Sequence, residues 1–450
     1  MKDTITAPAT AQGQAGVGII RVSGPLVPEM TKKLTGSLPK PRHAVYANFL
    51  DVENSVIDQG LVVYFPGPNS FTGEDVVEFQ GHGGPVVQNM LMNRIIELGA
   101  RFAKPGEFSE RAFLNDKIDL TQAEAISDLI AANSEKAARS AMRSLQGEFS
   151  KKINMLVEKL IELRMFVEAA IDFPEEEIDF LADEKISKSL EKIYFCLKNI
   201  IKEANQGALL RDGIHVVIAG KPNAGKSSLL NILSGEETAI VTDIPGTTRD
   251  VIREKVLIDG LTLNITDTAG LRNTDDLVEQ EGVKRAWAEI KNADIILIVV
   301  DETNTSLGEM QNDFPELFLS TQNAKKIILR NKIDLLGLKP SVKESEECVD
   351  IFVSVKTGEG VDAFKNILKK TVGFEDNTES TFIARQRHCD ALQRSKKHMD
   401  QAKTQLHEFK AGELLAEELR HAQHALSEIT GEFSSDDLLG KIFSSFCIGK

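Results

Sequence analysis

The 450-residue sequence contains few cysteines, one tryptophan and no long apolar segment. Its four cysteines, Cys196, Cys348, Cys389 and Cys447, lie far apart and form no Cys-x-x-Cys pair. This spacing indicates a reducing compartment and argues against a thiolate zinc site. No apolar run approaches the ~20 residues that a membrane span needs. The first residues have neither an apolar core nor an arginine-rich stretch, so we expect a cytoplasmic protein without a signal or transit peptide.

Acidic residues outnumber basic ones, 68 to 53, which gives a formal net charge of −15. With 42% hydrophobic and 27% charged residues, the composition is that of a folded globular protein and excludes a disordered or collagen-like chain. The net charge argues against a surface covered with phosphate-binding cations. Two local basic clusters could still contact RNA, although a solvated helix face is the favoured interpretation. The clusters are Arg139, Arg143, Lys151 and Lys152, and Arg385, Arg387, Arg394, Lys396, Lys397, Lys403 and Lys410.

The residue composition and hydrophobic periodicity change three times along the sequence. The length suits two to four domains of ~100–200 residues each. Residues 1–117 combine short β-rich runs with one amphipathic helical segment, which predicts a compact α+β domain. Residues 118–211 and 373–450 are helical, whereas residues 212–372 alternate between strand and helix patterns. The simplest topology is therefore a helical bundle interrupted by an inserted α/β domain. Two independent helical domains are the alternative.

A phosphate-binding loop is predicted at residues 220–227, whose sequence GKPNAGKS fits GxxxxGK[ST]. It follows a strand-like run and begins a helical one, which is the context that this motif requires. Backbone N–H groups at the helix start would face the phosphates, Lys226 would reach the β- and γ-phosphates, and the Ser227 hydroxyl would hold Mg²⁺. The predicted contacts of this loop are Asn223, Ala224, Gly225, Lys226, Ser227 and Ser228.

Three further short motifs follow predicted strands in the order that a Ras-like GTPase needs: DTAG at 267–270, NKID at 331–334 and SVK at 354–356. Asp334 can accept hydrogen bonds from N1–H and the exocyclic amine of guanine. Adenine lacks this donor pair and would leave a buried carboxylate without partners. The predicted nucleotide contacts are Asp267, Thr268, Ala269, Gly270, Asn331, Lys332, Asp334, Ser354, Val355 and Lys356.

The segment between the phosphate loop and Asp267 contains two threonines after a Pro-Gly pair. A threonine here would complete the Mg²⁺ shell and respond to the γ-phosphate. A Pro-Gly turn with solvent-exposed hydroxyls is the alternative. The residues of this segment predicted to contact GTP are Thr242, Asp243, Ile244, Pro245, Gly246, Thr247 and Thr248.

Position 271 is a leucine, where Ras-type enzymes carry the glutamine that orients the attacking water. Another group must therefore act on the water, and no arginine finger can be assigned. A bound monovalent cation could supply the missing positive charge, with the amide oxygen of Asn223 among its ligands. The acidic residues available for the water are Asp275, Asp276, Glu279 and Glu281.

More specific patterns lie near the two ends of the chain. They are GVGIIRVSG at 16–24, SFTGED at 70–75, GHGG at 81–84, KPGEFSERAF at 104–113 and FCIGK at 446–450. Together with the nucleotide-binding motifs, these segments resemble the bacterial MnmE (TrmE) family of tRNA modification GTPases over essentially the full length of the chain.

The resemblance implies an N-terminal domain that forms a homodimer and binds 5-formyl- or 5,10-methylene-tetrahydrofolate, a helical domain, and an inserted G domain. It assigns folate contacts to Arg21, Glu78, Lys117 and Lys450, K⁺ ligands to Asn223, Thr242, Ile244 and Thr247, and Mg²⁺ ligands to Ser227 and Thr248. It also implies that Glu279 acts on the hydrolytic water and that Cys447 is functional.

The family acts with the flavoprotein MnmG, in an expected heterotetramer, on the wobble uridine (position 34) of certain tRNAs. It places a (carboxymethyl)aminomethyl group on C5. GTP hydrolysis is expected to be stimulated by K⁺ through dimerisation of the G domains. A regulatory GTPase of ribosome assembly, whose N-terminal domain only binds a partner, is the competing hypothesis.

Overall fold

The computed structural model describes residues 3–11, 13–172, 184–236, 253–267, 290–304, 308–309, 311, 324–345, 348–375, 381–432, 436–446 and 449. The chain divides into two compact units, each built from segments distant in sequence. Unit 1 comprises Met1–Ser127, Ser144–Leu197 and Ala391–Lys450, and unit 2 comprises Asp128–Arg143 and Lys198–Asp390.

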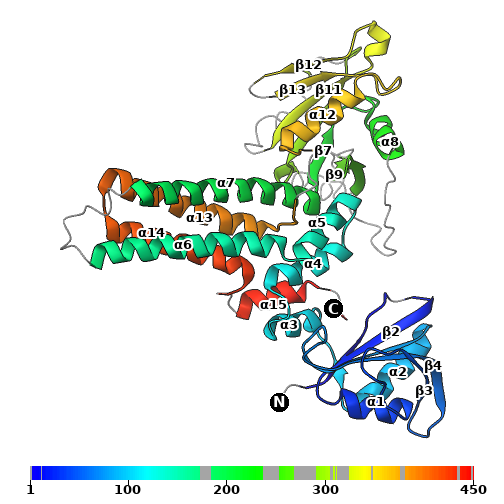
Figure 1. The fold of residues 1–450 in the computed structure, drawn as a ribbon. Coiled ribbons are helices and arrows are strands. Elements are labelled where there is room, and N and C mark those ends of the chain that lie inside the picture. Colours follow the sequence, from blue (N-terminus) through cyan, green and yellow to red (C-terminus); the bar gives the residue numbers. More distant parts are fainter. Residues whose placement is uncertain are drawn as a thin grey trace, which may run out of the picture. The chain divides into compact units, whose positions relative to one another are not determined.

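The N-terminal part of unit 1 is a six-stranded sheet with the order β3-β4-β5-β2-β1-β6. Helices α1 (Val27–Thr35) and α2 (Pro85–Glu97) cover one face, where they pack on alternate strand residues such as Ile20, Val77 and Phe79 (Figure 1). Because side chains alternate between faces, the residues between these point to the opposite face. The strands are β1 (Ile5–Pro8), β2 (Ala15–Ser23), β3 (Val45–Leu50), β4 (Val56–Phe65), β5 (Val76–Gly83) and β6 (Arg101–Phe102).

The rest of unit 1 is helical, and α6 (Glu148–Asp172) and α14 (Gly412–Thr430), which come from the two helical stretches of the sequence, lie side by side (Figure 1). The guanidinium of Arg164 in α6 donates to Gln423 Oε1 in α14 at 2.7 Å, and Lys403 in α13 pairs with Glu191 in α7 at 2.8 Å. Helix α6 is described up to Asp172, and the Phe173-Pro174 pair, which predicts a helix end, lies outside the described residues. No helix among the described residues is long and apolar enough to cross a bilayer.

Helix α3 and the helices of the two helical stretches have these bounds: α3 (Glu107–Leu114), α4 (Leu120–Ile130), α5 (Glu135–Leu145), α6 (Glu148–Asp172), α7 (Glu184–Asp212), α13 (Gln386–Thr404), the π-helix η3 (Gln405–Phe409), α14 (Gly412–Thr430) and α15 (Asp436–Ser444).

Unit 2 contains a seven-stranded sheet with the order β12-β13-β11-β10-β7-β9-β8. Strands β9, β7, β10, β11 and β13 are mutually parallel, so their carboxyl ends meet at one edge, where ligands bind in open α/β sheets. Its elements are β7 (Ile214–Ala219), α8 (Lys226–Glu236), β8 (Arg253–Ile258), β9 (Leu261–Asp267), β10 (Ile295–Asp301), β11 (Lys325–Asn331), η2 (Ile333–Leu336), β12 (Ser341–Glu344), β13 (Cys348–Phe352) and α12 (Val361–Val372).

The two ends of the inserted α/β segment are tied to one buried carboxylate. Asp128 Oδ1 accepts hydrogen bonds from Arg211 Nε at 2.9 Å and from Arg385 Nη2 at 2.8 Å. Arg211 lies in the last turn of α7 and Arg385 directly precedes α13, so the chain leaves and returns at one place. The insertion predicted from the sequence is confirmed. The boundaries predicted at residues 117, 211 and 372 stay predictions, since the compact units divide the chain elsewhere.

Candidate functional site

The predicted phosphate loop lies between the end of β7 and the start of α8, at the edge where the parallel strands end. Lys226 Nζ donates hydrogen bonds to the carbonyls of Gly220 at 2.8 Å and Lys221 at 3.2 Å, which holds the ammonium group over the loop. Ser227 and Ser228 are exposed in the first turn of α8. An exposed helix start with an adjacent ammonium group favours an anionic ligand.

Asn331 joins this loop to the predicted guanine-binding loop. Its side chain is 3% exposed; Nδ2 donates to the carbonyl of Ala224 at 2.9 Å, and Oδ1 accepts from the Val355 N–H at 3.0 Å. Gly225 makes this approach possible, because a Cβ atom there would lie 2.2 Å from Asn331 Nδ2. Gly225 also has φ 107°, a conformation that favours glycine. One amide thus fixes the distance between two loops.

Asp334, the residue predicted to select guanine, is oriented by Ser354. The fully buried Ser354 donates its hydroxyl to Asp334 Oδ1 at 2.7 Å and accepts a hydrogen bond from the Thr357 N–H at 3.2 Å. Asp334 lies in the 3₁₀-helix η2, directly after β11, and Ser354 follows β13. Since β11 and β13 are parallel neighbours, their two motifs meet at one edge. The carboxylate therefore lies beside the first residue of the SVK motif.

Asp301, which the sequence analysis did not select, belongs to the same edge. It ends β10 and accepts a hydrogen bond from Lys332 Nζ at 2.6 Å. Burial would raise the pKa of Asp301, but hydrogen bonds from Lys332 and Thr303 lower it below its ordinary value. The ion pair holds the lysine of the NKID motif, whose φ is 68°. The sequence signal that could have identified Asp301 is an acidic residue at the end of an apolar strand, which pairs with β11.

Of the predicted site residues in the remaining motifs, the structure describes Asp267. Asp267 ends β9, where its backbone pairs with Ile218 of β7, close to the start of the phosphate loop. The following predicted site residues lie outside the residues that the structure describes: Thr242, Asp243, Ile244, Pro245, Gly246, Thr247, Thr248, Thr268, Ala269, Gly270, Glu279, Cys447 and Lys450.

A second cluster lies on the N-terminal sheet, on the face opposite α1 and α2. Arg21 and Glu78 are register partners on β2 and β5, and Glu78 Oε1 accepts from Arg21 Nε at 3.0 Å and Nη2 at 2.9 Å. The guanidinium carbon of Arg21 lies 5.7 Å from the ring centre of Phe71 and 5.8 Å from that of Phe108. Two aromatic rings thus flank a cation that is paired with a carboxylate. The sequence analysis did not select either ring.

Lys117 and Gly449 lie against the same domain. The stem of Lys117 packs on Gly73, where an added Cβ would lie 3.4 Å from Cγ and Cδ of the lysine. Gly449 is buried against β1, where an added Cβ would lie 2.1 Å from the carbonyl oxygen of Pro8. Pro8 is the register partner of Ile20, the neighbour of Arg21. Arg21, Glu78 and Lys117 therefore share one region, and the terminal segment lies against the adjoining strand.

The parallel sheet, the lysine-capped phosphate loop and the Asp334–Ser354 pair define a P-loop GTPase. Two protein-family models match the chain: "GTP-binding protein TrmE N-terminus" at residues 4–117 and "MnmE helical domain" at residues 120–447. The chain belongs to the MnmE family of tRNA modification GTPases.

Full-length relatives support this assignment. The tRNA modification GTPase MnmE of Coxiella burnetii (strain Dugway 5J108-111) is 58% identical over 453 residues, which are 100% of this chain and 99% of the relative. The protein of the same name from Vibrio cholerae (strain ATCC 39315) is 58% identical over 450 residues, with the same coverage.

Solved structures give a much weaker match. The G domain of the T. maritima FeoB iron transporter is 24% identical, has a TM-score of 0.25, and covers 36% of this chain and 96% of its own. Aquifex aeolicus Era bound to GDP and AlF4⁻ is 23% identical, has a TM-score of 0.28, and covers 42% of this chain and 67% of its own. The family assignment rests on the sequence relatives.

Replacing Asn331 by alanine tests the link between the two loops. The change leaves the Ala224 carbonyl and the Val355 N–H without their partner, so the affinity for GTP and GDP should fall by about 10- to 100-fold, the value of one to two hydrogen bonds. The preference for guanine should stay, because Asp334 and Ser354 are untouched. Titration with a fluorescent GDP analogue measures both effects. Asn304→Ala, at an exposed residue after β10, is the matched control, and an unchanged GDP affinity in Asn331→Ala would contradict the proposed link.

Proposed function

We propose that this chain binds and hydrolyses GTP and that the hydrolysis serves modification of the wobble uridine (position 34) of tRNA in the cytoplasm. The observation that carries the nucleotide part is the Asn331 amide, which joins the phosphate loop to the loop beside Asp334. The tRNA part is supported by relatives at 57–58% identity over the full chain, which are named tRNA modification GTPases.

The modification we propose is a (carboxymethyl)aminomethyl group on C5 of uridine, made together with the flavoprotein MnmG. The one-carbon unit would come from 5-formyl- or 5,10-methylene-tetrahydrofolate bound at Arg21, Glu78, Lys117 and Lys450. The chemistry of the described residues fits this ligand. A carboxylate such as Glu78, held in place by Arg21, can accept the adjacent N–H and amino donors of a pterin ring, and a cation such as Lys117 can pair with a carboxylate of the glutamate tail.

The N-terminal domain is also the proposed site of homodimerisation. Apolar side chains are exposed on β3 and β4, with 67% of Tyr46, 51% of Val56 and 40% of Leu61 accessible. Strand β3 is the last strand of its sheet, so its outer backbone groups can pair with another chain. These features support a contact between two copies, on which a heterotetramer with MnmG would be built.

Two cations are part of the proposal. Mg²⁺ would be held by Ser227 and Thr248, and K⁺ by Asn223, Thr242, Ile244 and Thr247, with Glu279 acting on the hydrolytic water. The described ligands fit hard cations, because both present oxygen atoms at the exposed start of α8 and in the loop before it. Bound K⁺ would supply positive charge next to the phosphates. The protein would position that charge through the side chain of Asn223, whose φ of 63° turns the loop at this residue.

The guanine assignment is tested by Asp334→Asn. An amide presents a donor where guanine needs an acceptor, so GTP affinity should fall by at least about 100-fold and xanthosine triphosphate should become a substrate. Steady-state hydrolysis of both nucleotides measures the change. Asp362→Asn, at an exposed position that starts α12, is the control and should behave as wild type. If Asp334→Asn kept its preference for GTP, the guanine site would be assigned wrongly.

The K⁺ site is tested by comparing KCl with NaCl at equal ionic strength. Hydrolysis should be about 10-fold faster in KCl, which corresponds to ~1.4 kcal/mol of transition-state stabilisation. Asn223→Gly should remove this difference. Glycine is the suitable replacement because it removes the amide but accepts the positive φ of this residue. Equal rates in both salts for the wild type would exclude K⁺ from the mechanism.

A further inference from the structure

The loop between β4 and β5 forms a wall of the N-terminal cluster. Its residue Phe71 faces the guanidinium of Arg21, and its residue Gly73 lies against the stem of Lys117. Two side chains that are distant in sequence thus contact the same short loop. The loop therefore places Phe71 beside the Arg21–Glu78 pair and Gly73 beside Lys117.

Polar groups of β2, of α3 and of the turn after α3 bind the buried side of the loop. Glu74 Oε2 accepts hydrogen bonds from Arg111 Nη1 at 3.0 Å and from the Ser23 hydroxyl at 2.9 Å. Ser23 and Thr72 hydroxyls lie 2.7 Å apart, and both residues are fully buried. The Thr72 carbonyl accepts from Asn115 Nδ2 at 2.6 Å. The inner side of the loop is therefore fixed to β2 and to α3 with the turn that follows it.

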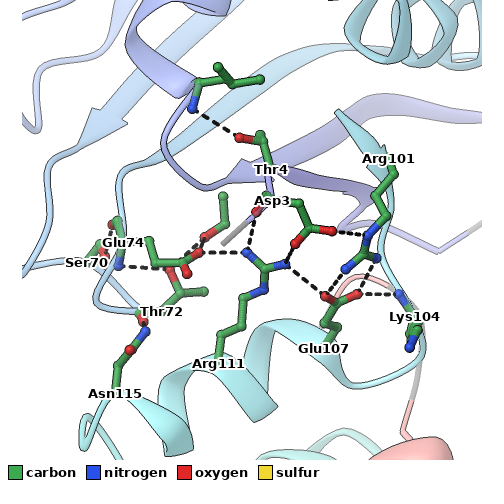
Figure 2. Close-up of polar contacts among 12 residues, drawn as sticks. Asp3, Thr4, Ser70, Thr72, Glu74, Arg101, Lys104, Glu107, Arg111 and Asn115 are labelled. Atoms are coloured by element: carbon green, nitrogen blue, oxygen red, sulfur yellow. Dashed lines mark hydrogen bonds and ion pairs between the residues drawn. The ribbon is translucent and has the colours of Figure 1, made fainter. Parts of the chain in front are cut away.

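Arg111 connects the loop to the N-terminal segment and to the start of its own helix, α3 (Figure 2). Besides Glu74, its guanidinium donates to the Asp3 carbonyl at 2.8 Å, to Asp3 Oδ1 at 2.8 Å and to Glu107 Oε1 at 2.9 Å. Arg101 pairs with Asp3 and Glu107 at the far side of the network, and Figure 2 shows no bond from Arg101 to the described residues of the loop. Arg111 is the cation that reaches from this network to Glu74.

Glu107 is ionised at neutral pH. Burial would raise the pKa of Glu107, but hydrogen bonds from Arg101, from the backbone N–H of Lys104 and from Arg111 lower it to about 2. The side chains of Arg111 and Glu74 are 9% and 11% exposed, so their attraction is little screened by water. Removing one partner leaves the other as a buried charge, which shifts the loop or opens it to solvent.

We propose that Arg111 and Glu74 are positioning residues of the N-terminal site, which set the affinity for a reduced folate by fixing the loop that carries Phe71 and Gly73. This inference rests on the proposed folate binding. It adds Glu74, on the buried side of the loop, and Arg111, which pairs with Glu74 from α3. Neither residue is expected to touch the ligand.

The test compares Glu74→Gln, Arg111→Lys and Arg101→Met in the full-length chain. Glu74→Gln keeps the side-chain volume and an acceptor for Ser23 but loses the charge, and Arg111→Lys keeps the charge but loses the fork of donors. Arg101→Met removes a cation from the same network without touching the loop. Binding of 5-formyl-tetrahydrofolate is measured by equilibrium dialysis, and opening of residues 66–75 by hydrogen–deuterium exchange. GTP hydrolysis and the thermal midpoint report the fold.

Glu74→Gln and Arg111→Lys should raise the Kd for the folate by about 10-fold, the value of one charge-assisted hydrogen bond, and should speed exchange in the loop. Arg101→Met should keep the Kd within about twofold, because it leaves the Arg111–Glu74 bond in place. GTP hydrolysis should be unchanged in all three. Unaltered exchange in the loop, or an equal loss of affinity in Arg101→Met, would overturn the positioning role. Absence of folate binding in the wild type would instead overturn the proposed folate function, while the exchange data would still decide whether the pair fixes the loop.

Discussion

The side-chain amide of Asn331 is the interaction on which the nucleotide site depends. It satisfies one carbonyl in the phosphate loop and one N–H in the loop after β13, so neither loop can move without breaking a buried hydrogen bond. The parallel strands bring these loops to one edge of the sheet, but strand pairing alone would leave their separation open. Gly225 admits the amide, and Ser354 and Asp301 then orient the two other polar residues of the NKID motif.

The N-terminal cluster is built in a related way, with buried polar side chains fixing a loop that presents outward-facing groups. Here the register of β2 and β5 places Arg21 opposite Glu78, and helix α3 supplies Phe108 next to Arg21 and Arg111 next to Glu74. Gly106 is the N-cap of the same helix. A Cβ atom added at Gly106 would lie 2.5 Å from the carbonyl oxygen of Phe443 in α15. Helix α15 is thus packed on the helix that supports the proposed folate site.

The sequence was sufficient to predict the parts of the molecule that depend on local patterns. The phosphate loop, the strands before Asn331 and Ser354, and the insertion of the α/β domain are confirmed, because each has a short motif or a change of periodicity. The contacts of Asp301 with Lys332, and of Phe71 and Phe108 with Arg21, were not predicted. They join residues that are far apart in sequence, and no spacing rule reports which side chains a sheet or loop brings together. The roles of Thr248, Glu279, Lys450 and the other undescribed residues stay predictions from the family resemblance.

In the proposed function, nucleotide hydrolysis and one-carbon chemistry serve a single reaction on tRNA. The most direct measurement is mass spectrometry of wobble-uridine nucleosides in tRNA from cells whose own gene is replaced by this chain or by its Glu78→Gln variant. The account predicts that the unaltered chain restores the C5-modified nucleoside. It predicts that Glu78→Gln leaves the uridine unmodified at the C5 position while GTP hydrolysis by the purified variant continues. Unmodified uridine with the unaltered chain, or full modification with Glu78→Gln, would contradict it.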